Sequence, residues 1–595
     1  MQFLMWAAVL MIFTFLKLVS AETEISSAAA CAAADRAALL GFKASIVKDT
    51  TGFLSTWTGG DCCGGGWEGV ECGGGRVNRL ILQNPSPDSD VVFMKGFLSP
   101  SLGNLHFLEI MVISGMKRIA GAIPESFSNL TRLTQLVLDD NSLQGNVPSS
   151  LGHLRNLQTV SLSGNRLMGQ IPPALGSLRN LLQLNLAKNL LTGSIPKAVG
   201  VLTSLQSLDL SFNSLSGSIP DFLGQLQNLT YLVLSRNQFS GQIPIPLCSL
   251  VQLSELSLDQ NQLSGRIPPQ IRNIKSVSVL KLSSNKLTGQ IPASISELQS
   301  LWNLNLSRNL LSSPLPDAAF AKGLPSLLSI DLSYNNLDLG AVPSWIRNRE
   351  VSDVHLAGCK LRGALPNFTK PDSLSTLDLS DNYFTGGISG FLENMASLQS
   401  AKVSNNLLKA DISSIRLPDQ ISSLDLHSNQ LFGSLPRLLS NKTSKFLEVI
   451  DVSNNQISGS FPEFIVGLNL KVLNLASNKI AGHIPVSVSN LAKLEKIDIS
   501  RNQISGTIPT SLGSLLRLHW LDLSSNGLTG RIPDSLLGIK ALRHASFRAN
   551  RLCGMIPQGR PFNIFPAAAY AHNLCLCGKP LPPCKGKKTN RKMGQ

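Results

Sequence analysis

The chain has 595 residues, of which 43% are hydrophobic and only 6% are aromatic, with 48 Gly, 32 Pro and 10 Cys. This hydrophobic content excludes a disordered chain, and the length exceeds the roughly 250–300 residues at which one core stops growing, which leaves several domains or a repeat array. The formal net charge of +15 favours anionic partners.

The first segment has the pattern of a secretion signal. Residues 3–16 are almost entirely apolar, and the small residues Val19, Ser20 and Ala21 precede Glu22. We therefore predict a signal peptide over residues 1–21 and a secreted protein, which argues against a nucleic-acid partner. The apolar run is shorter than the roughly 20 residues of a membrane span, and no later segment approaches that length, so we expect no span.

A unit of 24 residues then recurs along most of the chain. Residues 157–172 read LQTVSLSGNRLMGQIP, and residues 181–196 read LLQLNLAKNLLTGSIP. With degenerate units around residues 80–82 and 111–113 there are about twenty units, which is the leucine-rich-repeat pattern. The recurring position is Asn in all units but one: Asn141, Asn165, Asn189, Asn213, Asn237, Asn261, Asn285, Asn309, Asn335, Cys359, Asn382, Asn406, Asn429, Asn455, Asn478, Asn502, Asn526 and Asn550.

Each unit predicts one short strand and one turn. In residues 160–162 the two apolar residues point inward and Ser161 points outward, and the following Asn165 turns the chain and bonds backbone groups. No unit buries its leucine face alone, so the units must stack. We predict an α/β repeat solenoid: a right-handed, curved superhelix with a concave parallel β-sheet.

Cysteines gather before the first unit and after the last. Such clusters in a secreted chain favour disulfide-bonded caps, formed by Cys31, Cys62, Cys63 and Cys72 and by Cys553, Cys575, Cys577 and Cys584. Cys248 and Cys359 lie more than four units apart, too far for a disulfide, and are predicted to be buried thiols. We expect the cap at 22–76, repeats at 77–551, a second cap at 552–584 and a basic tail at 585–595.

The caps resemble those of one protein family. Residues 35–43 (DRAALLGFK), Trp57 and Trp67 with the first cysteines are similar to the N-terminal cap of plant extracellular leucine-rich-repeat proteins. The units carry the plant-type Leu-Thr/Ser-Gly-x-Ile-Pro ending. Residues 550–584 are similar to the C-terminal cap of polygalacturonase inhibitors and their secreted relatives. The resemblance implies the pairs Cys31–Cys62, Cys63–Cys72, Cys553–Cys575 and Cys577–Cys584.

The chain departs from the proteins that it resembles in two respects. Polygalacturonase inhibitors have about half as many repeats, so their inhibitory surface does not carry over residue by residue. Plant receptor kinases and receptor-like proteins share such an ectodomain but continue into a membrane span, which we do not expect here. No long island interrupts the repeats, so the ligand site is expected on the solenoid itself.

Catalytic and cofactor motifs are weak. Residues 64–69 (GGGWEG) match a nucleotide-binding pattern but follow two cysteines, and are interpreted as a cap loop. Histidines lack metal-ligand spacing, so we predict no enzyme, no cofactor and no metal. Seven outward strand positions are Asp, interpreted as part of the repeat on an open sheet that does not perturb their pKa values: Asp209, Asp331, Asp378, Asp425, Asp451, Asp498 and Asp522.

Five glycosylation sequons fit a secreted glycoprotein. Asn305 differs from the others because it is predicted in a strand, where a glycan would project from the concave face and block central binding. The sequons are Asn129, Asn228, Asn305, Asn367 and Asn441.

Three functions remain open. The leading hypothesis is a secreted protein that binds a peptide or protein on its concave sheet, in plant defence or developmental signalling, with a membrane co-receptor as a candidate second partner. The first alternative is an inhibitor of a cell-wall-degrading enzyme such as a polygalacturonase. The second alternative is a protein bound to pectin or another wall polyanion, which the basic tail suggests. A solvated chain end is the simpler interpretation of that tail. The tail cations are Lys585, Lys587, Lys588, Arg591 and Lys592.

Two surfaces are candidate sites. The first is a stripe of cations and aromatics at the position before the recurring Asn, together with Tyr231 and Trp302, suited to an extended anionic or aromatic ligand; ordinary surface variation is the alternative. The stripe comprises Lys188, Phe212, Arg236, Gln260, Ser284, Arg308 and Tyr334.

The second surface is a predicted docking patch for another protein near the end of the sheet. Arg and Trp are typical of interface hot spots, although these residues also fit a chain that is basic everywhere. The patch comprises Lys496, Arg501, His519, Trp520, Arg543, His544 and Arg548.

Overall fold

The computed structural model describes residues 30–435, 439 and 446–584. The predicted signal peptide, the sequon at Asn441 and the basic tail lie outside these residues. Contacts divide the chain into two units, unit 1 at Met1–Leu215 and unit 2 at Ser216–Gln595.

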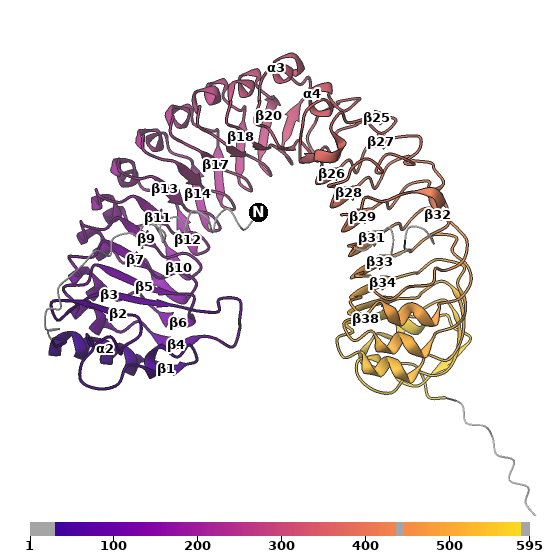
Figure 1. The fold of residues 1–595 in the computed structure, drawn as a ribbon, viewed down its shortest axis with the longest axis horizontal. Helices are drawn as coiled ribbons and strands as arrows, with labels where there is room; N and C mark the ends of the chain where they lie inside the picture. Colours follow the sequence, from indigo (N-terminus) through magenta and orange to yellow (C-terminus); the bar gives the residue numbers. More distant parts are fainter. Residues whose placement is uncertain (1–29, 436–438, 440–445, 585–595) are drawn as a thin grey trace, which may run out of the picture. The chain divides into compact units, whose positions relative to one another are not determined.

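The main sheet of unit 1 is built from short strands, one for each repeat. β2 and β3 pair antiparallel, and from β3 onward each strand pairs in parallel with the strand of the next repeat (Figure 1). The strands are β2 (Val70–Gly73), β3 (Arg76–Gln83), β5 (Ile110–Ser114), β7 (Gln135–Val137), β9 (Thr159–Ser161), β11 (Gln183–Asn185) and β13 (Ser207–Asp209).

The main sheet of unit 2 continues this pattern over its own repeats, again with parallel neighbours in register. The strands are β15 (Tyr231–Val233), β17 (Glu255–Ser257), β19 (Val279–Lys281), β21 (Asn303–Asn305), β23 (Ser329–Asp331), β24 (Asp353–His355), β26 (Thr376–Asp378), β28 (Ser400–Lys402), β29 (Ser423–Asp425), β31 (Val449–Asp451), β33 (Val472–Asn474), β34 (Lys496–Asp498), β36 (Trp520–Asp522) and β38 (His544–Ser546).

Leucine alternation explains these strands. In β11 the central Leu184 is fully buried while Gln183 and Asn185 remain partly exposed, and Leu186 after the strand is buried again. The same inward residues meet those of neighbouring repeats and form the core. The predicted repeat solenoid with a parallel β-sheet is confirmed.

A second set of strands lies apart from the main sheet, and from β8 onward each strand of this set follows the recurring Asn position. In unit 1, and at its boundary for the last strand, these are β1 (Ile46–Asp49), β4 (Met94–Phe97), β6 (Lys117–Gly121), β8 (Ser142–Asn146), β10 (Arg166–Gly169), β12 (Leu190–Gly193) and β14 (Ser214–Ser218). In unit 2 they are β16 (Gln238–Gly241), β18 (Gln262–Gly265), β20 (Lys286–Gln290), β22 (Leu310–Ser312), β25 (Arg362–Gly363), β27 (Tyr383–Phe384), β30 (Phe432–Gly433), β32 (Gln456–Ile457), β35 (Ser505–Thr507), β37 (Gly527–Gly530), β39 (Arg551–Met555) and β40 (Cys575–Cys577).

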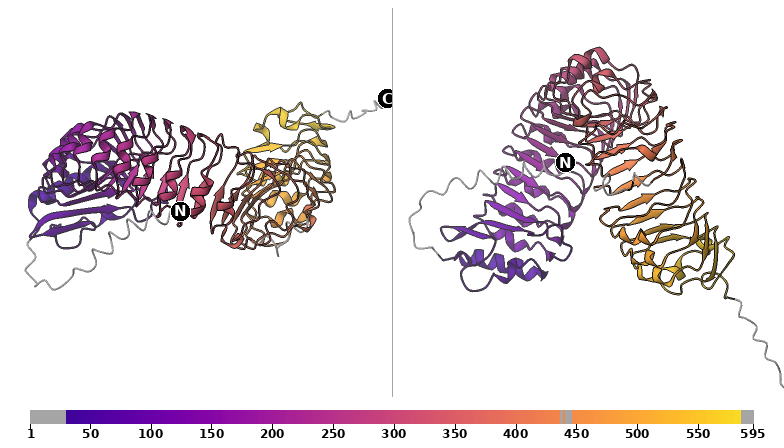
Figure 2. Two further views of the ribbon diagram at one scale, coloured as in Figure 1. Left: turned by 90° about the horizontal axis from the view of Figure 1, so that it is seen from above. Right: turned by 45° about the vertical axis from the view of Figure 1, so that its right-hand side comes forward.

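Short helices close most repeats on the side away from the main sheet (Figure 2). Many begin directly after the Pro of the repeat, because Pro fixes φ and needs no hydrogen-bond acceptor; Pro172 before η5 is one example. In unit 1 they are η1 (Phe53–Ser55), η2 (Pro100–Asn104), η3 (Glu125–Asn129), η4 (Ser149–His153), η5 (Pro173–Ser177) and η6 (Lys197–Val201). In unit 2 they are η7 (Asp221–Gln225), η8 (Ile245–Ser249), η9 (Pro269–Asn273), η10 (Ala293–Glu297), η11 (Pro371–Ser373), η12 (Ile412–Ser414), η13 (Val486–Asn490), η14 (Thr510–Ser514), η15 (Asp534–Gly538), η16 (Phe562–Ile564) and η17 (Ala567–Tyr570).

The N-terminal cap covers the first leucine face with α2 (Ala33–Ser45). Asp35 is fully buried, and it accepts hydrogen bonds from the Arg76 guanidinium at 2.8 and 2.9 Å and from the Val77 N–H at 2.9 Å. Trp57 and Trp67 stack with ring centroids 5.4 Å apart. This paired charge and the two buried rings tie the cap to the first repeats.

Disulfides close both ends of the array. They join Cys31 to Cys62, Cys63 to Cys72, Cys553 to Cys575 and Cys577 to Cys584, which are the four pairs implied by the resemblance. Cys248 and Cys359 are buried free thiols, as expected.

Two repeats of unit 2 are irregular. They carry α3 (Asp317–Lys322) and α4 (Ser344–Arg347) where other repeats have short helices. Trp345 packs edge-on against Phe320, with centroids 5.0 Å apart, and its indole N–H donates to Asp317 at 2.9 Å. The Arg349 guanidinium donates to the carbonyls of Phe320, Gly323 and Leu324, so these two repeats are joined by side chains as well as by strands.

Candidate ligand-binding surface

A ladder of buried Asn side chains holds the exposed face of the main sheet, which we call the strand face. The Asn189 amide donates to the carbonyls of Leu162, Leu186 and Ala187 at 2.9, 3.2 and 3.1 Å, and its oxygen accepts the Leu167 N–H at 2.9 Å. The three donated bonds begin at Asn141, whose side-chain oxygen is buried without a partner, and the complete pattern begins at Asn165. Each rung satisfies backbone groups of two repeats, so the residues beside it are held in fixed positions.

The ladder extends one step beyond the predicted Asn series. Asn573, inside the predicted C-terminal cap, donates to the carbonyls of Phe547 and Tyr570 at 3.0 and 2.9 Å and accepts the Leu552 N–H at 3.0 Å. Its segment lacks the full leucine pattern, and the dipeptide His572-Asn573 after an apolar residue is the one signal that could have identified it.

Cys359 interrupts the ladder. Its sulfur lies 3.6 Å from the Leu332 carbonyl oxygen and 3.7 Å from that of Ala357, which are weak contacts. Asn382 compensates in part, because its side-chain oxygen accepts the N–H groups of both Cys359 and Leu361. Among the described residues, the N–H of the buried Leu337 has no such acceptor.

The predicted stripe occupies a left-handed backbone position. All seven of its residues have φ between 53° and 56°, and Phe212 and Tyr334 do so although bulky side chains rarely adopt this conformation. Six stripe residues are exposed and Ser284 is half-buried. Lys188 and Phe212 belong to unit 1, whereas the other five belong to unit 2.

Unit 2 joins part of the stripe into a chain of side chains. The Arg308 guanidinium lies over the Tyr334 ring, 4.5 Å from its centroid. The Tyr334 hydroxyl donates to Asp381 at 2.6 Å, and the Asn405 amide donates to the other oxygen of Asp381 at 2.9 Å. Burial and then the Asp381 hydrogen bond raise the pKa of Tyr334 to about 12.

Tyr231 and Trp302, which were predicted to act together with the stripe, lie at other positions of the strand face. Tyr231 begins β15, is 43% exposed, and is in register with Glu255 of β17. Trp302 precedes β21 and is half-buried, and its carbonyl accepts N–H groups of the next repeat. Both residues therefore line the beginning of the strands, while the stripe lines the turn that follows them.

The expectation that the outward Asp residues keep unperturbed pKa values is wrong at two positions. Burial and the neighbouring Asp522 carboxylate raise the pKa of Asp498. Burial alone would raise the pKa of Asp425, but the hydrogen bond and charge of His427 outweigh it and lower that pKa. Parallel stacking brings Asp522 to about one strand spacing from Asp498, whereas His427 lies two residues after Asp425 in the same repeat.

Asp425 and His427 also belong to a polar cluster that sequence reasoning missed. The His427 Nδ1 lies 2.6 Å from Asp425, and one donor atom from each of Asp425, His427 and Asp451 lies within 4.8 Å of the others. The Asp425 hydrogen bond raises the pKa of His427. Asp451 accepts the Ser453 N–H at 2.9 Å and the Asn474 amide at 2.7 Å, so hydrogen bonds satisfy the cluster internally.

A second unforeseen carboxylate lies in unit 1. Asp139 accepts the Ser161 hydroxyl on both of its oxygens, at 2.7 and 2.8 Å, and the Ser163 N–H at 2.7 Å. Burial raises the pKa of Asp139 to about 6. Ser161 points outward as predicted, yet it is only 4% exposed because Asp139 covers it.

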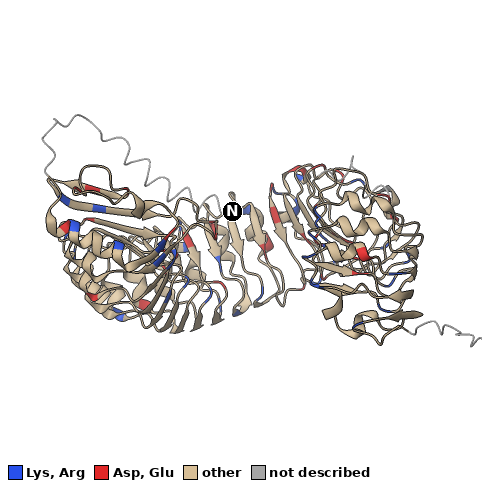
Figure 3. Cartoon of the chain, turned by 90° about the horizontal axis from the view of Figure 1, so that it is seen from below, with Lys and Arg blue, Asp and Glu red and all other residues tan. Residues whose placement is uncertain are grey.

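The predicted docking patch contains one compact row. Lys496, Trp520 and His544 begin three adjacent strands and are in register. The Trp520 and His544 rings stack at 3.6 Å, and the Lys496 ammonium lies 5.4 Å from the Trp520 ring. His519 and Arg543 precede Trp520 and His544, while Arg501 and Arg548 lie at the turns, all exposed. Lys and Arg are interspersed with Asp and Glu along the chain (Figure 3), and the docking role of this patch stays a prediction.

The described sequons lie in different environments. Asn129, Asn228 and Asn367 are exposed at or near the helices and loops, away from the main strands. Asn305 ends β21, is half-buried, and accepts hydrogen bonds from the Ser307 hydroxyl at 2.7 Å and the Ser307 N–H at 3.1 Å. Its position on the strand face is the one that the sequence predicted.

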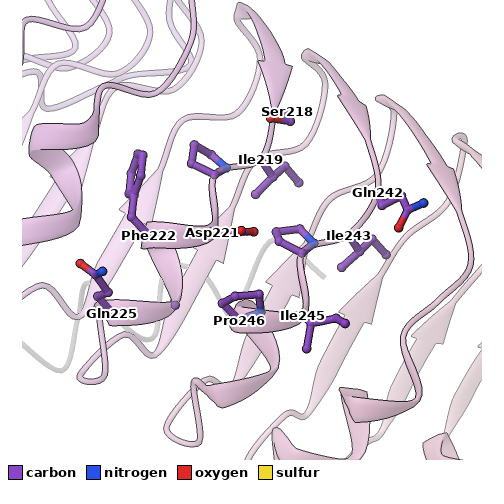
Figure 4. Close-up of a pocket in the computed structure, with 12 residues that line it drawn as sticks. Ser218, Ile219, Asp221, Phe222, Gln225, Gln242, Ile243, Ile245 and Pro246 are labelled. Atoms are coloured by element: carbon purple, nitrogen blue, oxygen red, sulfur yellow. The ribbon is translucent and has the colours of Figure 1, made fainter.

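An open hollow of about 900 Å³ lies near η7 and η8 (Figure 4). Phe222, Ile245 and Pro246 contribute apolar surface, and Asp221 supplies the single charge of its lining. The lining comes from the short helices and the ends of second strands, so this hollow is separate from the strand face.

Comparisons with known families match the repeats and the first cap. A leucine-rich repeat region matches residues 89–242 and a leucine rich repeat N-terminal domain matches residues 32–73. Further leucine rich repeats match residues 252–274, 276–298, 373–395, 445–504 and 517–539. A solved structure, the ectodomain of the Arabidopsis thaliana receptor kinase GASSHO1/SCHENGEN3 in complex with CASPARIAN STRIP INTEGRITY FACTOR 2, has a TM-score of 0.71 and 31% identity, covering 88% of this chain and 65% of that one.

The chain is a plant extracellular leucine-rich-repeat protein. It is related to the ectodomains of receptor-like proteins and receptor kinases. The Arabidopsis receptor kinase HAESA, solved with the peptide hormone IDA and the co-receptor SERK1, has a TM-score of 0.59 and 28% identity, covering 93% of this chain and 100% of that one. Receptor-like protein 54 of Arabidopsis thaliana is 38% identical over 186 residues, 27% of this chain and 23% of that protein.

This leucine-rich-repeat protein matches its curated relatives over part of their length. The DNA damage-repair/toleration protein DRT100 of Arabidopsis thaliana is 33% identical over 127 residues, 20% of this chain and 34% of that protein. The related ectodomains are non-catalytic. Among the described residues, no helix combines the length and apolar character needed to cross a membrane.

Proposed function

We propose that this protein is a secreted, non-catalytic recognition protein that binds a peptide or protein ligand on its strand face, in plant defence or developmental signalling. The observation that carries this proposal is the stripe. Its side chains differ in charge and size from one repeat to the next, while the Asn ladder holds their backbone in one conformation. Such a surface provides a rigid scaffold with a changeable outer layer. Related ectodomains solved with peptides support the same use.

The test compares ligands captured by the wild type and by an Arg236→Glu, Arg308→Glu variant. Both proteins are incubated with apoplastic fluid, the peptides retained by the wild type are identified by mass spectrometry, and their affinities for both proteins are then measured. We expect at least a tenfold loss of affinity in the variant with only a small fall in the thermal midpoint, because both side chains are exposed and Arg308 loses its contact with the Tyr334 ring. Equal affinity of the two proteins would reject the stripe as the site.

We further propose that the patch around Trp520 docks a membrane co-receptor. A stacked Trp and His beside a Lys present an aromatic and cationic surface of the composition found in interface hot spots. HAESA was solved with a co-receptor, which supports the comparison. A Trp520→Ala, Arg543→Ala variant should lose one membrane protein in pull-downs from membrane extracts and keep its ligand. Recovery of every wild-type partner would reject the docking role.

Inhibition of a cell-wall-degrading enzyme remains the second candidate. It is favoured by the C-terminal cap, whose disulfides have the pairing that the resemblance to polygalacturonase inhibitors implies. Residual polygalacturonase activity measured with increasing amounts of the purified protein decides this point, because a stoichiometric inhibitor reduces it to a plateau.

A further inference from the structure

Three cations lie side by side on β1, β4 and β6, the first three strands of the second set in unit 1. In the β1, β4 and β6 sheet, Lys48 is in register with Lys95, and Lys95 is in register with Arg118. Residues directly opposite on neighbouring strands share one face of a sheet, so the three side chains form a row. All three are exposed.

The row surrounds an aromatic residue. Phe93, Lys95 and Phe97 alternate along β4 and its first flanking residue, so they share the face of the row. The Arg118 guanidinium lies 3.8 Å from the Phe93 ring centroid and the Lys48 ammonium 5.5 Å from it, which leaves that ring only 6% exposed. Phe97 is 56% exposed and offers a free aromatic surface beside the cations.

Nothing in the described part of the chain neutralises this row. The ion pairs there include Lys117 with Asp90 at 3.3 Å, but none involves Lys48, Lys95 or Arg118. Asp49 is adjacent in sequence, yet its carboxylate accepts the N–H groups of Thr51 and Leu54 at 2.8 and 2.9 Å. Like charges directly opposite one another repel, and an anion that lies across the row would relieve this repulsion.

We propose that this row, with Phe97, binds an acidic polysaccharide of uronic acids. Adjacent strands are about 4.8 Å apart, on the order of one hexose residue, so successive carboxylates can meet successive cations. The apolar face of a sugar ring packs on the exposed Phe97 ring. Charge-assisted hydrogen bonds to Lys and Arg supply the attraction, and they weaken as salt screens them.

The site does not depend on peptide binding at the strand face, and its test is separate. The probe is oligogalacturonate, titrated calorimetrically into the full secreted chain at low salt and at about 0.15 M salt. The test variant carries Lys48→Glu, Lys95→Glu and Arg118→Glu. The matched control carries Arg155→Glu, Lys286→Glu and Lys540→Glu, three exposed cations outside the row, so that both variants lose the same charge.

We expect binding that is weaker at the higher salt, at least a tenfold loss of affinity in the row variant and less than a threefold loss in the control. Phe97→Ala should weaken binding severalfold without changing the salt dependence. If the row variant does not fold, Lys95→Gln, which contacts neither Phe ring in the structure, should still reduce affinity severalfold. Equal losses in both triple variants, no loss in the row variant, or tighter binding to anionic phospholipid vesicles than to oligogalacturonate would each overturn the proposal.

Discussion

Tyr334 reaches across two repeats to donate a 2.6 Å hydrogen bond to Asp381. It passes over the intervening Gly358, where a Cβ atom would come within 3.0 Å of the Tyr334 ring. Tyr334, which the sequence predicted as a ligand contact, is therefore also part of an internal contact between repeats, which we call the brace. Its hydroxyl is occupied by Asp381, so its ring is the part that a ligand can contact.

Gly358→Ala tests this brace. Alanine at φ of 64° costs about 1–2 kcal/mol by itself, and its methyl group additionally displaces Tyr334. Gly340→Ala is the matched control, because Gly340 has φ of 63° and open space around it. We expect the Gly358 variant to unfold at lower urea concentration than the Gly340 variant, and the difference to vanish when Tyr334→Ala is added to both. Identical midpoints in the two single variants would contradict the brace.

Cys359→Asn should repair the ladder. The new amide would donate to the Leu332 and Ala357 carbonyls, and its oxygen would accept the Leu337 N–H, as in the other rungs. A net gain of about 1 kcal/mol in the free energy of unfolding is expected, measured by urea denaturation. Cys359→Ala serves as the control and should lower the stability, since it leaves the same carbonyls with no donor.

The two free thiols should resist alkylation in the folded protein. Burial raises the pKa of Cys248 to about 11 and that of Cys359 to about 12, so neither is ionised at neutral pH. Mass spectrometry after alkylation should find no modified cysteine in the native protein, two after denaturation, and all 10 only after reduction. Rapid labelling of the native protein would contradict the burial of these thiols.

Asp139 should make unit 1 less stable as the pH rises. Its pKa lies at about 6 in the folded chain, above the ordinary 3.8, so folding favours the protonated form. The free energy of unfolding should therefore fall between pH 4 and pH 6, by about 1–3 kcal/mol, and level off above that range. Asp139→Asn should remove this fall in thermal unfolding measured across the same range. A variant with the wild-type pH profile would show that another group is responsible.

The sequence was sufficient for the features that depend on one repeat at a time. Leu184 is buried because its neighbours in the chain alternate with it, and Asn189 bonds backbone groups at fixed offsets, so both follow from a 24-residue period. The two caps could also be predicted, because the cysteines are few and most of them lie in two clusters.

Features that depend on the stacking of repeats could not be predicted from the sequence. Phe212 and Tyr334 adopt a left-handed backbone that their residue types would not suggest, because the adjacent ladder imposes it. The contact of Tyr334 with Asp381 spans 47 residues, and stacking places Asp451 of the next repeat beside Asp425 and His427. The in-register row of Lys48, Lys95 and Arg118 likewise required knowledge of the strand pairing.

The side-chain contacts between the two irregular repeats limit how such an array can gain or lose single repeats. An ordinary repeat bonds to its neighbours through the same backbone and Asn contacts everywhere, so its gene segment can be duplicated or deleted and the remaining contacts re-form. Arg349 does not allow this, because its three acceptor carbonyls belong to the preceding repeat. Recombination that separates α3 from α4 leaves the half-buried Arg349 guanidinium without these acceptors, which favours inheritance of the two repeats together.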